Sequence, residues 1–276
     1  MKVLVNYANS LFRQAQEKNS ATGRQMAAFD QVLSFGPQDI DSSFVARNRR
    51  VLDIKRGNGL WLWKPYFICR VLDELADSDF LFYCDSGAYF LAPIDPLLAL
   101  CDKHGQDVIP FELPFPESDW TKRDAFVLLG CDSPEFVQTR QRLASFHAWR
   151  KSDRSMRLAR EWLELAQDER LIGDSANQCG LTDYPGFEEH RWDQSIFSLL
   201  TKKHRLAGFR NPSQHGNRSR ERYPHCTYPQ LIEHTRDRRH SLMGGLWRRL
   251  WGGVKRLSTR RTAAAEQVSA RGGRAA

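Results

Sequence analysis

Asp85 has a residue type and a position that could serve chemistry, because it directly follows a continuous apolar run of strand length at residues 80–84 (FLFYC). Open α/β sheets place their ligands at the carboxyl ends of such buried strands. A carboxylate there could hold a divalent cation, which would neutralise a diphosphate and stabilise it as a leaving group. The tripeptide Asp85-Ser86-Gly87 is also a common turn sequence, and on these three residues alone the turn is the stronger interpretation.

A second candidate is the polar segment at residues 188–195 (EEHRWDQS), which is followed directly by an apolar run. His190 could be a metal ligand or a phosphate contact, and Arg191 could bind phosphate through two parallel hydrogen bonds. Asp193 and Gln194 could hold sugar hydroxyls, or Asp193 could act as a base. The segment is equally typical of a helix N-terminus, with Asp193 near the positive end of the dipole and Arg191 solvated. Both interpretations stay open.

Two tryptophans alternate in residues 59–66 (GLWLWKPY), so Trp61 and Trp63 share one face if the segment is extended. They could stack on a base or a sugar ring, with Lys64 close to a phosphate. Packing into the core is the commoner outcome for a tryptophan pair, and we expect it for at least one of them.

These candidates need a scaffold that brings distant segments together. Residues 3–7 (VLVNY) predict a first strand, and residues 80–84 predict a central strand that is covered on both faces. Apolar residues at helical spacing after Pro65 predict a helix that feeds this central strand. Such a connection indicates an α/β fold with a mostly parallel central sheet flanked by helices. Further expected elements are a helix at roughly 22–32, an edge strand at 107–111 because of Pro110, a helix starting at Ser133, a helix at about 155–170 and a loop at 210–228.

The positive charge of the chain is concentrated at its end. The 276 residues carry a net charge of +8, but residues 236–276 hold eleven Lys or Arg and only two acids, so the preceding residues are nearly neutral. A near-neutral body does not describe a basic groove for nucleic acid, and we expect no nucleic-acid partner.

Cysteine usage and hydropathy favour a cytoplasmic protein. The six cysteines form no C-x-x-C pair, which argues against a zinc site and for a reducing compartment. No apolar run reaches the roughly 18–20 residues of a membrane span. The apolar stretch at the N-terminus is too short for a secretory signal.

Four segments in a fixed order carry a resemblance to a known family. Residues 56–66 (RGNGLWLWKPY), 82–87 (FYCDSG), 120–124 (WTKRD) and 190–195 (HRWDQS) together resemble bacterial glycosyltransferase-like proteins of polysaccharide and surface-glycan clusters. The resemblance covers roughly residues 1–210, and the order of the motifs is more specific than any one of them. It implies a GT-A-like nucleotide-diphospho-sugar transferase fold. The catalytic domain is expected at residues 1–235, followed by a basic, amphipathic and partly disordered tail at 236–276.

For function, the resemblance implies transfer of a sugar from a nucleotide-diphosphate donor to a glycan or lipid-linked acceptor, assisted by a divalent cation, Mn²⁺ or Mg²⁺. Asp85 would stand in place of the metal-binding D-x-D motif, with Asp193 and His190 as catalytic residues. The segment at 190–195 should then lie within a ligand's length of Asp85. The donor and its phosphates would be contacted by Trp63, Lys64, Lys122, Arg123, Arg191 and Gln194.

The chain departs from the family pattern at Gly87, which leaves only one carboxylate in this motif. His190 or Asp193 is therefore expected to complete the metal site. Asn58 and Leu60 also replace the residues expected there and could tune the pocket. A second function class stays open, that of a non-catalytic transferase-like protein or a basic surface-binding interaction module.

The tail contains a candidate membrane-docking helix. Residues 242–257 (LMGGLWRRLWGGVKRL) place apolar side chains at helical spacings of three and four, with basic residues largely on the other face. Such a helix suits an anionic membrane surface, where a lipid-linked acceptor would be found. We therefore expect a protein that is peripheral at the inner face of the membrane. The alternative is a helix packed on the body, followed by a disordered basic end.

Overall fold

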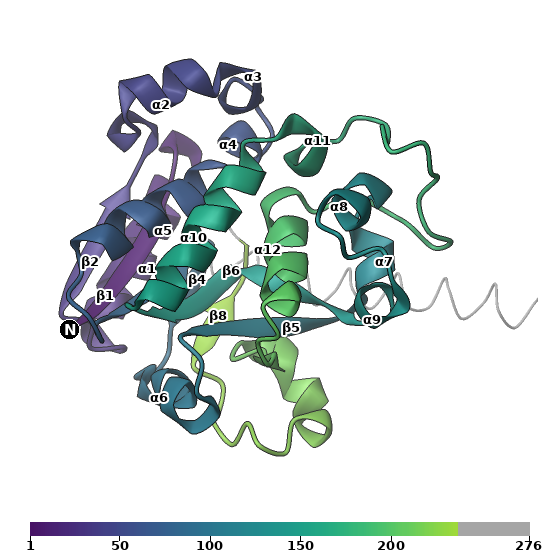
Figure 1. Cartoon of the computed structure of the whole chain (residues 1–276). Helices are drawn as coiled ribbons and strands as arrows, with labels where there is room; N and C mark the ends of the chain where they lie inside the picture. Colours follow the sequence, from purple (N-terminus) through teal and green to yellow (C-terminus); the bar gives the residue numbers. More distant parts are fainter. Residues whose placement is uncertain (237–276) are drawn as a thin grey trace, which may run out of the picture.

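A six-stranded central sheet organises residues 1–236, which are the residues that the computed structural model describes (Figure 1). Its strands are β1 (Lys2–Tyr7), β2 (Gln31–Phe35), β3 (Phe80–Cys84), β5 (Val108–Pro116), β6 (Arg140–Arg150) and β7 (Phe209–Arg210), in the order β2-β1-β3-β6-β5-β7. β1 is parallel to β2 and β3, and β5 is parallel to β7, whereas β6 is antiparallel to both of its neighbours. Only one of the six strands is therefore reversed. The expected α/β class with a mostly parallel sheet is confirmed.

Helices cover both faces of this sheet. α5 (Trp63–Glu74), α10 (Asp153–Ala166) and α12 (Trp192–Lys203) pack on one face, where their apolar side chains join those of the strands in one buried cluster (Figure 1). α6 (Asp95–His104) packs on the other face. α1 (Arg13–Gln25) also lies there, and it approaches so closely that a Cβ at Gly23 would be 2.5 Å from the Leu4 side chain. The shorter helices are α2 (Ser42–Arg47), α3 (Arg49–Leu52), α4 (Gly57–Leu60), α7 (Glu117–Trp120), α8 (Arg123–Leu128), α9 (Pro134–Val137) and α11 (Glu169–Ile172).

The connections around β1 define where a ligand can bind. The chain crosses from β1 to β2 through α1 on one face, and from β2 to β3 through α5 on the opposite face. The strand order therefore reverses between β1 and β3. Open α/β sheets bind ligands beyond the carboxyl ends of their strands at such a reversal. Tyr7 ends β1 and Asp85 follows β3, so both residues lie at this position.

A small second sheet brings the end of the described chain to the same edge. β4 (Ala88–Phe90), which begins just after Asp85, pairs antiparallel with β8 (Ile232–His234). Arg236, two residues after β8, donates its backbone N–H to the carbonyl of Gly87 at 3.0 Å.

Two expected elements are wrong in type or position. The helix expected at 22–32 is wrong because α1 ends at Gln25 and Val32 lies in β2, so the apolar spacing joined two different elements. Residues 107–111 do not form an edge strand, since β5 lies between β6 and β7. Pro110 falls where the register with β6 shifts, and this irregularity accommodates the missing N–H.

Other boundaries differ in detail. The helix expected at about 155–170 is divided into α10 and α11, and it starts earlier because the Ser152 hydroxyl caps it by accepting the Ser155 N–H at 3.1 Å. The loop expected at 210–228 contains the end of β7 and a 3₁₀ helix, η3 (Gln214–Arg222). Ser133 does precede a helix, but α9 has only four residues. Strand β6 was not expected. The other 3₁₀ helices are η1 (Ser10–Phe12) and η2 (Pro37–Asp39).

The tail hypothesis falls outside the described residues. The candidate docking helix at 242–257 lies beyond Arg236 and stays a prediction. Between residues 1 and 236, no helix is both long and apolar enough to cross a membrane.

Candidate functional site

Lys64 lies between two carboxylates at the carboxyl ends of the central strands. Its ammonium nitrogen, Nζ, is 2.8 Å from Oδ2 of Asp193 and 3.6 Å from Oδ1 of Asp85. The Lys64 and Asp193 side chains are 3% and 4% exposed, whereas Asp85 is 25% exposed. Asp85 is therefore the member of this cluster that a ligand can reach. The cluster also brings residue 193 to Asp85, as the sequence hypothesis expected.

Each member of the cluster comes from a different element. Lys64 belongs to the first turn of α5, Asp193 to the first turn of α12, and Asp85 follows β3. Tyr83 points toward the same place because side chains two apart in a strand share one face. Its hydroxyl donates to Oδ1 of Asp85 at 2.6 Å, and Lys64 Nζ lies 5.2 Å from its ring centroid.

Burial and the neighbouring charges shift the pKa values of Lys64 and Asp193 in opposite directions. Burial alone would lower the pKa of Lys64, but the Asp193 and Asp85 carboxylates together raise it above its ordinary value. Burial raises the pKa of Asp193 to about 6, although the Lys64 charge acts against this rise. Lys64 is therefore a cation throughout the physiological pH range, whereas the Asp193 carboxyl titrates close to that range.

The backbone that leads into α5 is strained. All five residues from 57 to 61 have positive φ angles, and three of them, Asn58, Leu60 and Trp61, are not glycine. A left-handed conformation costs roughly 1–2 kcal/mol for each such residue. Trp192, at the start of α12, also has a positive φ, and its ring packs against Trp61 with centroids 4.9 Å apart. Strain of this kind persists where the surroundings enforce it, and it concentrates at functional sites.

Trp63 is a core residue that orders this strained turn. It is 5% exposed and stacks on Tyr7 with ring centroids 3.7 Å apart. Its indole N–H donates to the carbonyl of Gly57 at 2.9 Å, and the Asn58 amide donates to the Tyr7 hydroxyl. The expectation that at least one tryptophan packs in the core is confirmed. Asn58, a departure from the family pattern, joins the turn to the end of β1.

Three guanidinium groups gather beside the cluster. Arg56 and Arg191 both form ion pairs with Glu189, the second at 3.5 Å. Burial lowers the pKa of Arg191; Glu189 opposes this, and the positive charges of Arg236 and Arg56 lower it further. The backbone N–H of Arg236 is hydrogen-bonded to the carbonyl of Gly87, two residues after Asp85 in the chain. Three arginines, two of them paired with Glu189, therefore lie at the edge of the site.

Lys122 and Arg123 belong to a separate group of ion pairs. Lys122 Nζ donates to the carbonyl of Ser175 at 3.2 Å and lies 3.5 Å from Oδ2 of Asp124. Arg123 pairs with Asp132 at 2.9 Å. These contacts tie α8 to the segment that precedes α12, and each cation has its own carboxylate.

His190 and Gln194 hold elements together. The Nδ1 atom of His190 accepts the backbone N–H of Lys122 at 3.2 Å, so Nε2 carries the proton and donates to the carbonyl of Leu171 at 2.7 Å. Burial lowers the pKa of His190 to about 3, which keeps the ring neutral. The Gln194 side-chain oxygen accepts the N–H of Ala144 in β6 at 3.2 Å. The geometry gives both residues a positioning role.

The described residues fit a divalent cation poorly. Mn²⁺ and Mg²⁺ need several oxygen ligands around one point, but Asp85 is the single reachable carboxylate of the cluster and Asp193 is held by Lys64. Within residues 1–236, no three His, Cys, Asp or Glu side chains are grouped so that they could share an ion. A metal role for Asp85 stays a prediction from the family resemblance.

Sequence reasoning missed Tyr7, Tyr83, Arg56 and Arg236. Tyr83 could have been found, because it lies two residues before Asp85 in a predicted strand and must share its face. Arg56 lay within a noted motif without an assigned role. No pattern in the sequence indicated Arg236 as a site residue, because its position depends on the pairing of β8 with β4.

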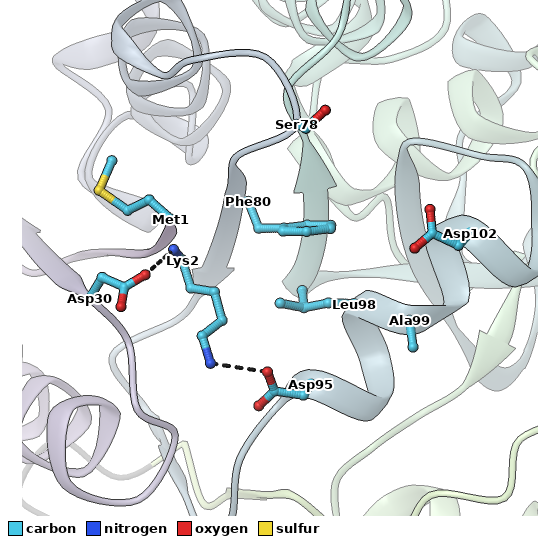
Figure 2. Close-up of a pocket in the computed structure, with 9 residues that line it drawn as sticks. All are labelled: Met1, Lys2, Asp30, Ser78, Phe80, Asp95, Leu98, Ala99 and Asp102. Atoms are coloured by element: carbon cyan, nitrogen blue, oxygen red, sulfur yellow. Dashed lines mark hydrogen bonds and ion pairs between the residues drawn. The ribbon is translucent and has the colours of Figure 1, made fainter.

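A separate hollow of about 370 Å³ lies at the opposite edge of the sheet (Figure 2). It is at the amino ends of β1 and β3, and Lys2 pairs there with two of the lining carboxylates. Lys2 Nζ contacts Asp95 at 3.0 Å, and the Lys2 backbone N–H donates to Asp30 at 2.6 Å. Its place away from the carboxyl ends of the strands sets it apart from the Asp85 cluster. Figure 2 labels all its lining residues: Met1, Lys2, Asp30, Ser78, Phe80, Asp95, Leu98, Ala99 and Asp102.

Comparison with known proteins finds similarity to solved structures but not to any family model or curated protein. Among solved structures, the chain is similar to mouse xyloside xylosyltransferase 1 in its apo form, with a TM-score of 0.45 and 11% sequence identity. The match covers 84% of this chain and 96% of that one.

Proposed function

We propose that this chain is a glycosyltransferase with a GT-A-like fold, which moves a sugar from a nucleotide-diphosphate donor to a glycan or lipid-linked acceptor. The observation that carries the proposal is the buried Lys64–Asp193 ion pair beside the reachable Asp85, at the strand-order reversal of the sheet. A carboxyl whose pKa is displaced by burial next to a specific charge partner is a candidate for a functional site.

The reaction requires stabilisation of a leaving group. The bond between the anomeric carbon and the diphosphate oxygen breaks, and its electron pair stays on the diphosphate. The acceptor oxygen forms the new bond to the anomeric carbon, and its proton passes to an oxygen of the departing diphosphate. Fixed positive groups next to the diphosphate favour this step because they meet the charge as it develops. Asp85 contacts the hydroxyls of the donor sugar, while Asp193 holds Lys64 in place.

A screen of UDP-, GDP-, CMP- and dTDP-sugars for binding and hydrolysis tests this function. We expect one nucleotide class to bind and to be hydrolysed slowly without acceptor. Asp85→Asn should keep the melting temperature and lower the hydrolysis rate by roughly 100-fold or more. Asp102→Asn, at a carboxylate that is 79% exposed on α6, is the matched control and should leave the rate unchanged. Failure of every donor to bind, with Mn²⁺ or with EDTA, would favour a non-catalytic interaction protein.

The proposed acceptor places the enzyme at an anionic membrane surface, through residues 242–257. Tryptophans beside basic residues in this segment support interfacial binding. Co-sedimentation with anionic liposomes tests this in the full-length chain, compared with a variant that carries Trp247→Ser and Trp251→Ser. Equal sedimentation of the two proteins would remove the tail from the mechanism.

A further inference from the structure

The backbone of Arg236 crowds the position at which a second metal-binding carboxylate would stand. In the D-x-D pattern, the second acid would stand at Gly87. A Cβ built there would lie 3.0 Å from the Cα of Arg236 and 3.5 Å from its carbonyl carbon. This is backbone, which cannot rotate aside as a side chain could. Glycine at this position therefore follows from the pairing of β4 with β8.

The space between the two carboxylates of the cluster is also occupied. Divalent cations bind carboxylate oxygens at about 2.0–2.6 Å. The Lys64 ammonium is already 2.8 Å from Asp193 and 3.6 Å from Asp85, and it is buried. A second cation in this position would be repelled by a neighbouring charge that water screens weakly. Lys64 thus stands where a metal ion would bridge Asp85 and Asp193.

The nearby arginines have the chemistry that a diphosphate requires. The Arg56 guanidinium lies over the Trp192 ring at 4.1 Å, and that of Arg191 lies over the Trp120 ring at 4.0 Å. A stacked guanidinium keeps its N–H edge available for hydrogen bonds, and this edge matches two oxygens of a phosphate. Both side chains are partly exposed, at 52% and 32%, and both now share Glu189.

We infer that this transferase binds the diphosphate of its donor without a divalent cation, an inference that rests on the proposed function. Lys64 is the fixed cation that orders Asp85 and Asp193. The guanidinium groups of Arg56 and Arg191 neutralise the phosphates, which displace Glu189 from both.

Isothermal titration calorimetry of the full-length chain with UDP, GDP, dTDP and ADP tests this inference. We expect the dissociation constant for the preferred nucleotide to agree within about twofold between EDTA and excess Mn²⁺ or Mg²⁺, a difference below about 0.4 kcal/mol. Arg56→Gln and Arg191→Gln should each weaken binding by about 10- to 100-fold, the loss typical of a charged hydrogen bond. Arg160→Gln is the matched control, because Arg160 pairs with Asp73 at 2.8 Å on the outside of α10.

The outcomes separate this inference from the proposed function. Binding that needs Mn²⁺ or Mg²⁺ overturns the inference but keeps the transferase. Metal-free binding that the two arginine variants retain, at unchanged melting temperature, overturns the role of the guanidinium groups. The absence of nucleotide binding under every condition overturns both.

Discussion

Lys64 and Asp193 form an ion pair of 2.8 Å in which both side chains are closed to water. Lys64 lies in the first turn of α5 and Asp193 in the first turn of α12, so the pair joins two helices at the end of the sheet where Asp85 follows β3. Two charges in such a place are stable only as partners, because each alone would lose its hydration without compensation.

Removal of one member of the Lys64–Asp193 pair should therefore destabilise the fold more than removal of both. Lys64→Met should lower the free energy of unfolding by about 3–5 kcal/mol, because Asp193 is left buried without its cation. The double variant Lys64→Met, Asp193→Leu should recover much of that loss. Urea denaturation measures the free energy of unfolding of the parent, the single variant and the double variant. Arg160→Met, which breaks an exposed ion pair, is the control and should cost less than about 1 kcal/mol. A double variant that is no more stable than Lys64→Met would contradict the pairing.

The stability of the fold should depend on pH through Asp193. Its pKa is about 6 in the folded chain and near 3.9 when unfolded. Between about pH 4 and 6 the folded chain keeps a proton that the unfolded chain has released, so this group lowers the free energy of unfolding as pH rises. The change amounts to about 3 kcal/mol across the window.

Comparison with Asp193→Asn isolates this effect. Carboxyls with lowered pKa values, such as Asp107, produce the opposite slope in both proteins and cancel in the difference. The stability of the parent minus that of the variant should fall as pH rises from about 4 to 6. A difference that is constant over this range would show that Asp193 does not titrate there.

The left-handed turn before α5 should tolerate no side chain at Gly59. This residue has a φ of +93°, and a Cβ there would lie 2.9 Å from the Cα of Leu52. Gly59→Ala should lower the free energy of unfolding by about 1–3 kcal/mol and also weaken nucleotide binding, because the turn positions Lys64. Gly130→Ala is the matched control, since Gly130 has a φ of +67° with open space around it. Thermal melts and nucleotide titration should show a loss of stability in both variants and a loss of binding only in the first.

His190 should prove a positioning residue. His190→Ala leaves the Lys122 N–H and the Leu171 carbonyl without their partner, at a cost of about 2–4 kcal/mol. The folded fraction of His190→Ala should bind nucleotide with a dissociation constant within about twofold of that of the parent. Loss of a direct hydrogen bond between His190 and the nucleotide would change the dissociation constant by more than this. His204→Ala, at an exposed histidine paired with Glu161, controls for the substitution. Intact stability with lost hydrolysis would instead support the catalytic role that the sequence hypothesis gave to His190.

The sequence predicted those parts of the fold that have strong local signals. β3 was expected at its observed residues because its apolar run is bounded by polar ones, and the first strand was placed within one residue. The apolar spacing from Met26 to Val32 was misleading, because Met26 is 45% exposed at the end of α1 and Val32 lies in the next strand, β2. β6 was not predicted from the sequence. Its side chains point alternately into the two apolar clusters on either side of the sheet, and the residues that complete those clusters are far away in the chain.

The candidate site was predicted in part. The residue types at 64, 85 and 193 indicated chemistry, and they do meet. That Lys64 would bridge two carboxylates, rather than approach a phosphate alone, could not be read from spacing, because it depends on how α5 and α12 converge. Lys122 and Arg123 were equally plausible from their charge, but they are paired within another group of side chains.

The pairing of β4 with β8 has a consequence for how an acceptor would reach the site. It places the backbone of Arg236 over Gly87, so the described part of the chain ends at the margin of the proposed donor site. A glycan or a lipid surface bound by residues 237–276 would be tethered close to the proposed donor site. Such tethering raises the local concentration of a weakly held acceptor to about the millimolar range for a short connection. Under the proposed function, the transferase would then act repeatedly on one acceptor before releasing it.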